Sequence, residues 1–199
     1  MENIWDQKFS SESYLYGELP NPGFKSFISS NKPGKILLPG EGEGRNAVFA
    51  AQQGWDVYAA DKSMVAMRKA KMLSEKYGVN FNYALGDLME QDYALESFDV
   101  IAPIFFHLNP EIRIQLHQFF VSLLKPGGKL YVLGFSTEQL NYSSGGPKDK
   151  NMLYSESKLA EDFKELQVIK NIRIETSLEE GEGHEGPASL IEFEALKPL

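Results

Sequence analysis

The 199-residue chain contains no cysteine and only three histidines. The lack of cysteine excludes disulfide bonds, thiolate zinc sites and cysteine nucleophiles. Of the histidines, only His107 and His117 lie near each other in the sequence, and we therefore predict that the chain holds no metal.

Long apolar runs and excess positive charge are also missing. No stretch approaches the ~20 apolar residues that span a bilayer. The first residues, MENIWDQKF, lack the basic and apolar regions of a signal peptide, and we expect a cytoplasmic protein without membrane contact. Twenty Lys and Arg stand against 28 Asp and Glu, giving a net charge of −8. This balance disfavours nucleic acid as a partner. We expect a small-molecule partner, and the oligomeric state is left open.

Apolar runs and helical patterns alternate along the chain with short connections. This order predicts an α/β fold: a single doubly wound, mostly parallel sheet with helices on both faces and an antiparallel carboxyl-terminal hairpin. Residues 1–199 form one predicted domain, and residues 1–34 are either a lid or cover for the sheet edge. We expect strands near 36–38, 57–60, 81–85, 98–104, 129–135, 168–178 and 188–195, and helices near 24–30, 45–53, 62–77, 110–124 and 155–166.

The most informative stretch is KILLPGEGEGRNAVFAAQQGWDVYAAD, residues 35–61. It predicts a strand, a glycine turn, a helix and a second strand that ends in Asp61. Gly40, Gly42 and Gly44 alternate in the turn, where glycine permits positive φ and close approach of backbone N–H groups to a ligand.

Asp61 stands where ligands bind in open α/β sheets, beyond the carboxyl end of a strand. A carboxylate there accepts the two hydroxyls of a ribose, or else caps the following helix. Together with the glycines it indicates a nucleotide-type ligand. The dinucleotide fingerprint requires a third glycine where Arg45 stands, which disfavours a nicotinamide-dependent dehydrogenase.

At EGEGRNAVF and again at LKPGGKLYVLGF, the sequence resembles the class I S-adenosylmethionine-dependent methyltransferases, in particular the tellurite-resistance and thiopurine methyltransferase-like subgroup. The resemblance implies a Rossmann-like fold, S-adenosylmethionine as cofactor and S-adenosylhomocysteine as product. It also implies that an aromatic amino-terminal segment closes over the cofactor.

The resemblance carries cofactor contacts onto four places in this chain. The resembling enzymes usually have an acidic residue where Leu38 stands, and Glu41 and Glu43 are the candidates to replace it. Asp87 is expected near the adenine amine, or else as a turn cap. The full predicted cofactor set is Gly40, Glu41, Gly42, Gly44, Arg45, Asn46, Asp61, Lys62, Ser63, Gly86, Asp87, Leu88, Pro103 and Ile104.

Two histidines are the catalytic candidates. His107 follows the fourth predicted strand and is either a base, a substrate contact or a packed side chain. His184 lies in the predicted loop EEGEGHEGP, which the resemblance places beside the donor methyl group. Glu179, Glu180, Glu182 and Glu185 share that loop, and four carboxylates there would repel an oxyanion such as tellurite. The alternative is a solvated hairpin tip in which His184 has no role.

The predicted activity is methyl transfer to a small molecule, with a thiol or another soft nucleophile as the favoured acceptor. A non-catalytic S-adenosylmethionine-binding module is the alternative from another class, and a dehydrogenase is the third.

Overall fold

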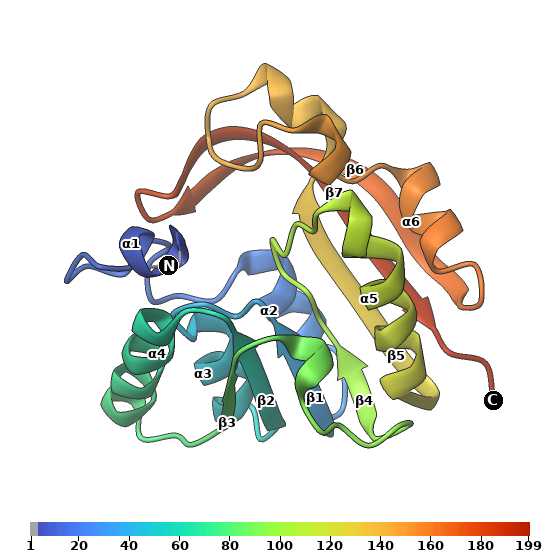
Figure 1. Ribbon diagram of the computed structural model, residues 1–199, viewed down its shortest axis with the longest axis horizontal. Coiled ribbons are helices and arrows are strands. Elements are labelled where there is room, and N and C mark those ends of the chain that lie inside the picture. The colour runs from blue at the N-terminus through green and yellow to red at the C-terminus, as the bar shows by residue number, and fades with distance from the viewer. Residues whose placement is uncertain (1–3) are drawn as a thin grey trace. The chain divides into compact units, whose positions relative to one another are not determined.

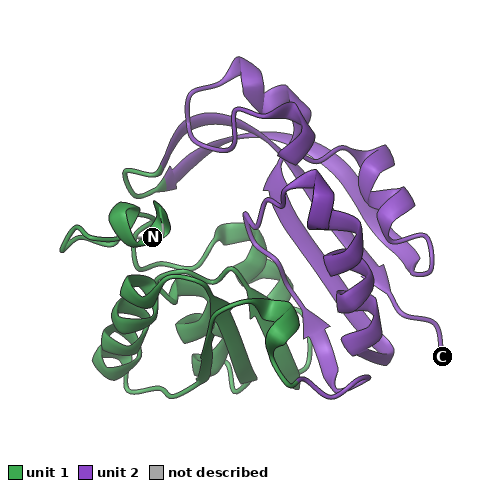
Figure 2. Ribbon diagram, in the orientation of Figure 1, with its two compact units in different colours: residues 1–92, 180–183 green, residues 93–179, 184–199 purple. Residues whose placement is uncertain are grey.

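The computed structural model describes residues 4–199, and these form two compact units (Figure 2). The first contains the chain up to residue 92 together with residues 180–183, and the second contains residues 93–179 and 184–199. That residues 1–199 act as a single functional domain stays a prediction.

The first unit is built on three parallel strands in the order β3-β2-β1 (Figure 1). Leu37 of β1 pairs with Tyr58 of β2, and Ala59 of β2 pairs with Tyr83 of β3. The β1 residues Ile36, Leu37 and Leu38 are fully buried, as a parallel strand covered on both sides requires. Its elements are α1 (Ile4–Lys8), α2 (Pro22–Ser29), β1 (Lys35–Pro39), α3 (Arg45–Gln52), β2 (Asp56–Asp61), α4 (Met64–Tyr77), β3 (Asn82–Leu85) and the 3₁₀ turn η1 (Leu88–Glu90).

Helix α4 is capped at both ends. The Ser63 side chain accepts a hydrogen bond from the Ala66 N–H and is therefore the N-cap. At the other end Gly78 adopts φ 66°, the left-handed conformation that stops a helix. Asp61 lies two residues before the cap, so its carboxylate stays at the end of β2.

The second unit contains four strands in the order β4-β5-β7-β6. Strands β4 and β5 are parallel, whereas β5 and β7 are antiparallel and pair from Lys129 with Leu196 to Phe135 with Leu190. Its elements are β4 (Phe98–Ile101), α5 (Pro110–Leu123), β5 (Leu124–Phe135), η2 (Thr137–Asn141), η3 (Lys150–Met152), α6 (Glu156–Asp162), β6 (Gln167–Glu180) and β7 (His184–Leu196).

The seven strands form one mixed, mostly parallel sheet, which confirms the predicted α/β class. The main difference from the sequence prediction lies in the carboxyl-terminal hairpin. Its strands extend to Glu180 and from His184, so the predicted loop shortens to a turn of residues 181–183. Alternating burial in β7 continues through these polar positions, because strand pairing outweighs the loop-like composition of EEGEGHEGP. No helix within residues 4–199 has the length and apolar content to cross a membrane.

Candidate functional site

The glycine turn after β1 has the predicted backbone conformation. Gly40, Gly42 and Gly44 adopt φ values of 64°, 63° and 90°, a region that other residues seldom occupy. The Glu41 N–H donates to the Ala60 carbonyl at 3.2 Å. The Gly42 N–H donates to a carboxylate oxygen of Asp61 at 3.0 Å, so the turn is tied directly to the end of β2.

Asp61 is positioned as a hydrogen-bond acceptor at the carboxyl end of β2. Its other oxygen accepts from the Ser63 N–H at 2.9 Å. Burial raises the pKa of Asp61, while the backbone N–H donors of Ser63 and Gly42 oppose that rise. Each carboxylate oxygen can accept more than one hydrogen bond, so the two backbone contacts orient Asp61 and leave capacity for a pair of hydroxyls.

Gly42 and Gly44 differ in the side chains that surround them. A Cβ on Gly44 would come within 2.7 Å of the Ala70 side chain, so Gly44 is required for α3 to pack against α4. A Cβ on Gly42 would lie 3.3 Å from the ring of Phe9, so this ring covers the turn. Phe9 stacks on Trp5 with ring centroids 5.5 Å apart, and the predicted aromatic segment therefore lies on the turn.

Glu41 is buried at the start of α3. Its carboxylate accepts a 2.7 Å hydrogen bond from the Ala47 N–H, where the capping residue Gly44 offers no side chain. Burial raises the pKa of Glu41 to about 7, and the Ala47 N–H opposes the rise. Glu41 is one of the two candidates to replace the acidic residue missing from β1, and it accepts a hydrogen bond from the first turn of α3.

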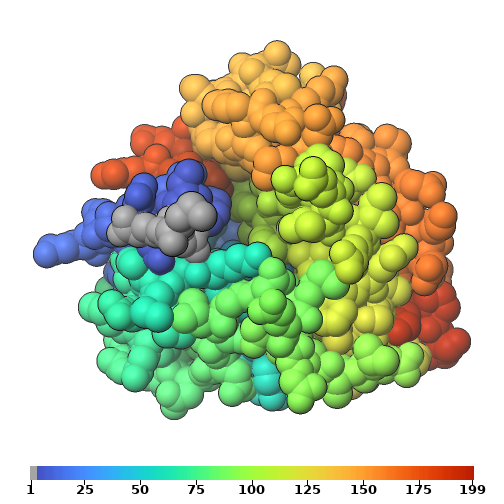
Figure 3. All heavy atoms as spheres, in the orientation of Figure 1, coloured from blue at the N-terminus to red at the C-terminus, as the bar shows by residue number. Residues whose placement is uncertain are grey.

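Glu43 instead fastens the amino-terminal segment. It accepts from the Leu15 N–H at 2.8 Å and forms an ion pair with Lys69 of α4. The Lys69 ammonium also donates to the carbonyls of Ser11 at 2.9 Å and Ser13 at 2.6 Å. In the space-filling view the blue amino-terminal atoms lie against the teal and green atoms of α4, and α1 contacts this helix (Figure 3).

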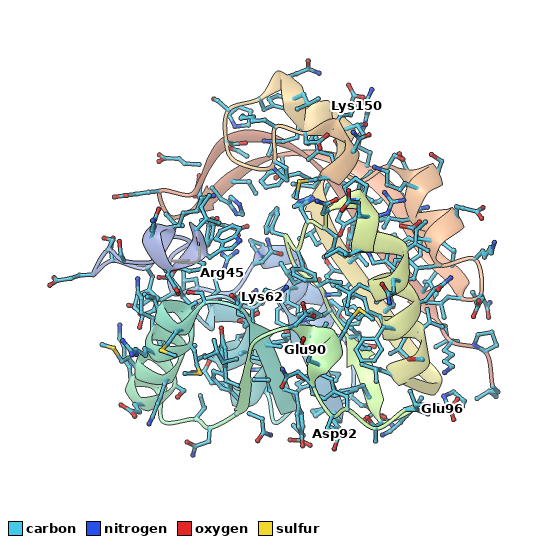
Figure 4. All side chains as sticks on the ribbon, in the orientation of Figure 1. Arg45, Lys62, Glu90, Asp92, Glu96 and Lys150 are labelled. Carbon is cyan, nitrogen blue, oxygen red and sulfur yellow. The ribbon has the colours of Figure 1, made fainter. Side chains whose placement is uncertain are left out.

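Arg45 forms a second anchor for the same segment. Its guanidinium pairs with Glu180 and donates to the carbonyls of Tyr16 at 3.2 Å and Leu19 at 3.4 Å. Glu180 also accepts from the Asn21 side chain at 2.7 Å. The Arg45 and Glu180 side chains are 8% and 6% exposed, so this is a buried pair. Figure 4 shows Arg45 beside the amino-terminal segment.

This pairing corrects the predicted charge of the acidic hairpin. Glu180 is neutralised by Arg45 and does not present a bare carboxylate to an acceptor. Three glutamates remain that could repel an oxyanion such as tellurite. Two of these, Glu179 and Glu185, lie in strands. Another predicted cofactor residue, Asn46, accepts from the Asn21 N–H at 2.9 Å and so holds the start of α2.

The turn of residues 181–183 packs on the amino-terminal segment without room for side chains. A Cβ on Gly181 would lie 2.5 Å from the Leu15 carbonyl oxygen, and one on Gly183 would overlap the Tyr16 ring. The Gly183 N–H donates to the Leu15 carbonyl at 3.0 Å. Residues 9–21 are thus held between the glycine turn and the hairpin turn, an arrangement consistent with a lid.

At the end of β3 the structure brings two predicted residues together. Lys62 and Asp87 form an ion pair of 2.7 Å, and their side chains are 59% and 42% exposed. The Lys62 ammonium lowers the pKa of Asp87. Asp87 also caps η1 through the Met89 N–H, the alternative role considered for it, while Gly86 takes φ 125° and Leu88 is buried.

The predicted contacts at the end of β4 belong to the second unit. Pro103 is buried, and Ile104 bridges to Leu133 of β5 in parallel register. The next residue, Phe105, adopts φ 52°, a conformation that is an outlier for a bulky side chain and costs about 1–3 kcal/mol. The Phe105 N–H donates to the Leu133 carbonyl at 2.7 Å, which holds this conformation.

The base role considered for His107 stays a prediction, and the contacts of its ring favour the packed alternative. Its Nδ1 lies 2.9 Å from the Met152 carbonyl oxygen, and its Nε2 accepts from the Phe135 N–H at 3.0 Å. Burial lowers the pKa of His107 to about 4. With a proton on Nδ1 and a donor on Nε2, both ring nitrogens are used, and the ring is a neutral bridge between β5 and η3. The packed role is the one that fits.

His184 is the first residue of β7 and not part of a loop, and because it is buried, the alternative of a solvated hairpin tip does not fit. Its ring lies 4.3 Å from the ring of Phe105 and 5.1 Å from that of Phe135, measured between centroids. Its catalytic role stays a prediction, and the role of a substrate contact is the one that the neighbouring rings favour.

Sequence reasoning missed several residues of this region. In the sequence, Lys69 is one of several lysines on a predicted helix, and Phe105 is one of two adjacent phenylalanines. Neither had a sequence signal, because the ion pair with Glu43 and the left-handed backbone both depend on tertiary contacts. Within residues 4–199 no group of three or more His, Cys, Asp or Glu side chains is arranged to hold a metal ion.

Comparison with known proteins agrees with this geometry. Residues 36–128 match the sequence model of a family described as "Methyltransferase domain", a span that contains the glycine turn, Asp61 and Asp87. No curated protein sequence matches the chain. Residues 36–128 are thus similar to a methyltransferase domain, which agrees with the predicted resemblance to class I enzymes. The match agrees with S-adenosylmethionine as the predicted cofactor.

Solved structures share the fold at low sequence identity. One concerns the conversion of a disulfide bond into a thioacetal group during echinomycin biosynthesis; it has 14% identity and a TM-score of 0.77, and the match covers 98% of this chain and 91% of that one. TehB from Haemophilus influenzae has 20% identity and a TM-score of 0.72, with 97% and 65% covered. A Burkholderia thailandensis 1,6-didemethyltoxoflavin-N1-methyltransferase, solved with S-adenosylhomocysteine, has 17% identity and a TM-score of 0.65, with 89% and 78% covered.

Proposed function

We propose that this chain transfers a methyl group from S-adenosylmethionine to a small-molecule acceptor whose nucleophile is soft, with a thiol favoured. The observation that carries the proposal is the hydrogen bond from the Gly42 N–H to Asp61, which joins the left-handed glycine turn to the carboxylate at the end of β2. A turn without Cβ atoms beside an oriented carboxylate suits a nucleoside with a ribose diol.

The residues of the first unit fit the donor in three respects. Asp61 would accept the ribose hydroxyls, and Asp87 would accept from the adenine amine. The backbone of Gly40 and Gly42 would lie along the methionine portion, and Phe9 above it would exclude water. Bound here, the donor supplies a methyl carbon whose bond to the sulfonium breaks as the acceptor lone pair forms the new bond, and the electron pair stays on the donor sulfur.

A soft acceptor fits the basicity of the available side chains. Because His107 is held neutral by two backbone partners, it offers no base for a hydroxyl or an amine. A thiol needs little base assistance, since a fraction is ionised near neutral pH and its proton passes to water. Positioning and removal of water then supply much of the rate. One of the similar structures concerns a disulfide-to-thioacetal conversion, which is also sulfur chemistry.

The test is a pair of calorimetric titrations, one with S-adenosylhomocysteine and one with NAD, followed by methyl-transfer assays. We expect micromolar binding of S-adenosylhomocysteine, no binding of NAD, and methylation of small thiols. Binding without turnover on any thiol, selenite or tellurite would instead indicate a non-catalytic binding module. Preferential binding of NAD would reject the assignment.

His184→Ala gives the matched test of the remaining histidine. If His184 contacts the acceptor, the variant should raise KM for every accepted thiol and leave the affinity for S-adenosylhomocysteine unchanged. Equal kinetics in parent and variant would remove His184 from the site. We also propose that the enzyme acts in the cytoplasm and does not bind nucleic acid, which a mobility-shift assay at physiological salt checks.

A further inference from the structure

Three rings of the second unit, those of Phe105, Phe135 and His184, form a cluster. Phe105 lies 4.8 Å from Phe135 and 4.3 Å from His184, measured between ring centroids, and Phe135 lies 5.1 Å from His184. We call these three residues the aromatic wall. Phe135 and His184 are buried at 1% and 4% exposure, whereas Phe105 is only partly buried. Phe105 is therefore the member that can touch another molecule.

The wall stands where a ligand is expected. Phe135 is the last residue of β5, and Phe105 follows the carboxyl end of the neighbouring parallel strand β4. Ligands of open α/β sheets bind beyond these carboxyl ends. The left-handed backbone of Phe105 adds an independent sign, because strained backbone persists at sites where the surroundings and the function require it.

Two groups that border the wall, His107 and Tyr154, are uncharged. His107 stacks on Phe135 at 5.7 Å with both of its nitrogens bonded to backbone atoms. Tyr154 stacks on His107, and its hydroxyl donates to the Phe106 carbonyl at 2.6 Å. An anionic acceptor against these rings would lose hydration without meeting a cation, which is unfavourable.

We propose that Phe105 selects the acceptor by its charge. Its ring contacts the acceptor and favours an uncharged, carbon-rich thiol over an anionic one. This inference rests on the proposed function, which it deepens by naming the substrate class and the residue that selects it. It adds a second source of discrimination to the acidic hairpin, in which Glu180 is paired with Arg45.

The experiment compares two thiols that differ in charge and by one ester methyl group, methyl 3-mercaptopropionate and 3-mercaptopropionate. We expect the parent to use the uncharged ester with a kcat/KM about tenfold higher, mainly through KM. Phe105→Asn removes the ring while tolerating the left-handed backbone, and it should bring the two thiols within about threefold of each other. Phe105→Tyr keeps a ring at the same position and should keep the discrimination.

Affinity for S-adenosylhomocysteine, measured in each variant, should stay at the parent value. Equal use of both thiols by the parent, or undiminished discrimination in Phe105→Asn, would overturn the inference; Phe105→Leu replaces Phe105→Asn if the latter does not fold. If neither thiol is methylated, the thiol assignment of the proposed function fails. The inference about Phe105 is then tested by nuclear magnetic resonance titrations of the same thiols with S-adenosylhomocysteine present. Ester binding that Phe105→Asn weakens would support the inference, and its absence would reject it.

Discussion

The two units differ in the chemistry of the side chains described above. The first places buried carboxylates, an arginine, a lysine and glycine backbone around the predicted donor contacts, and nearly every charge there has a partner. The second offers aromatic rings and a histidine whose nitrogens bond backbone atoms. The groups of the first unit, called here the charged unit, suit the proposed cationic donor with its ribose, and the rings of the second unit suit the proposed neutral acceptor.

The largest expected effect comes from breaking the main buried ion pair of the charged unit. Arg45→Met leaves Glu180 buried without its cation, and we expect a loss of about 3–5 kcal/mol in the free energy of unfolding. Lys164→Met is the control, because Lys164 pairs with Glu161 on the surface, where both side chains are 69% and 75% exposed. Denaturant titrations measure both. A loss in Arg45→Met no greater than in the control would show that the pair is not important for stability.

The next effect concerns the buried carboxyl of the glycine turn. Because the pKa of Glu41 is raised from 4.5 to about 7 in the folded protein, ionisation is easier in the unfolded chain. This contribution to stability is therefore present below pH 4.5 and is lost as the pH rises to 7. Glu41→Gln keeps an acceptor for the Ala47 N–H and does not ionise, so its stability relative to the parent should rise by about 3 kcal/mol from pH 4 to pH 8. Parallel pH profiles for parent and variant would contradict the burial argument.

A third test separates the donor contact from the fold. Asp61→Asn should weaken binding of S-adenosylhomocysteine by about 10- to 100-fold, since a charge-assisted hydrogen bond contributes about 1.5–3 kcal/mol. Asp56→Asn, at the exposed start of the same strand β2, should bind as the parent does. Calorimetry gives both affinities, and equal values for Asp61→Asn and the parent would leave Asp61 a purely structural role.

The smallest effect is expected at the end of β3. Asp87 is partly exposed and already paired with Lys62, so Asp87→Asn should weaken S-adenosylhomocysteine binding by only about twofold to fivefold. In 0.5 M salt the affinities of parent and variant for S-adenosylhomocysteine should differ less, because salt screens the charge of Asp87. A loss as large as that of Asp61→Asn would place Asp87 among the main donor contacts.

The sequence predicted those features that depend on local chemistry. The alternating glycines, the Ser63 cap and the order of strands each follow from residues a few positions apart. It failed where distant groups decide. No local pattern reveals that Arg45 will meet Glu180, and His107 was ambiguous until its backbone partners at Phe135 and Met152 were known. Pairing in the hairpin likewise moved His184 from a loop into a strand.

The Arg45–Glu180 pair has a further consequence for synthesis on the ribosome. The two residues lie 135 positions apart, so the buried guanidinium of the glycine turn stays without its carboxylate until most of the chain has emerged. A contact of such long range closes late, because the entropy of the intervening loop opposes it. A nascent chain that ends before residue 180 therefore lacks the carboxylate that pairs with Arg45, and the amino-terminal segment is not yet anchored as it is in the finished protein.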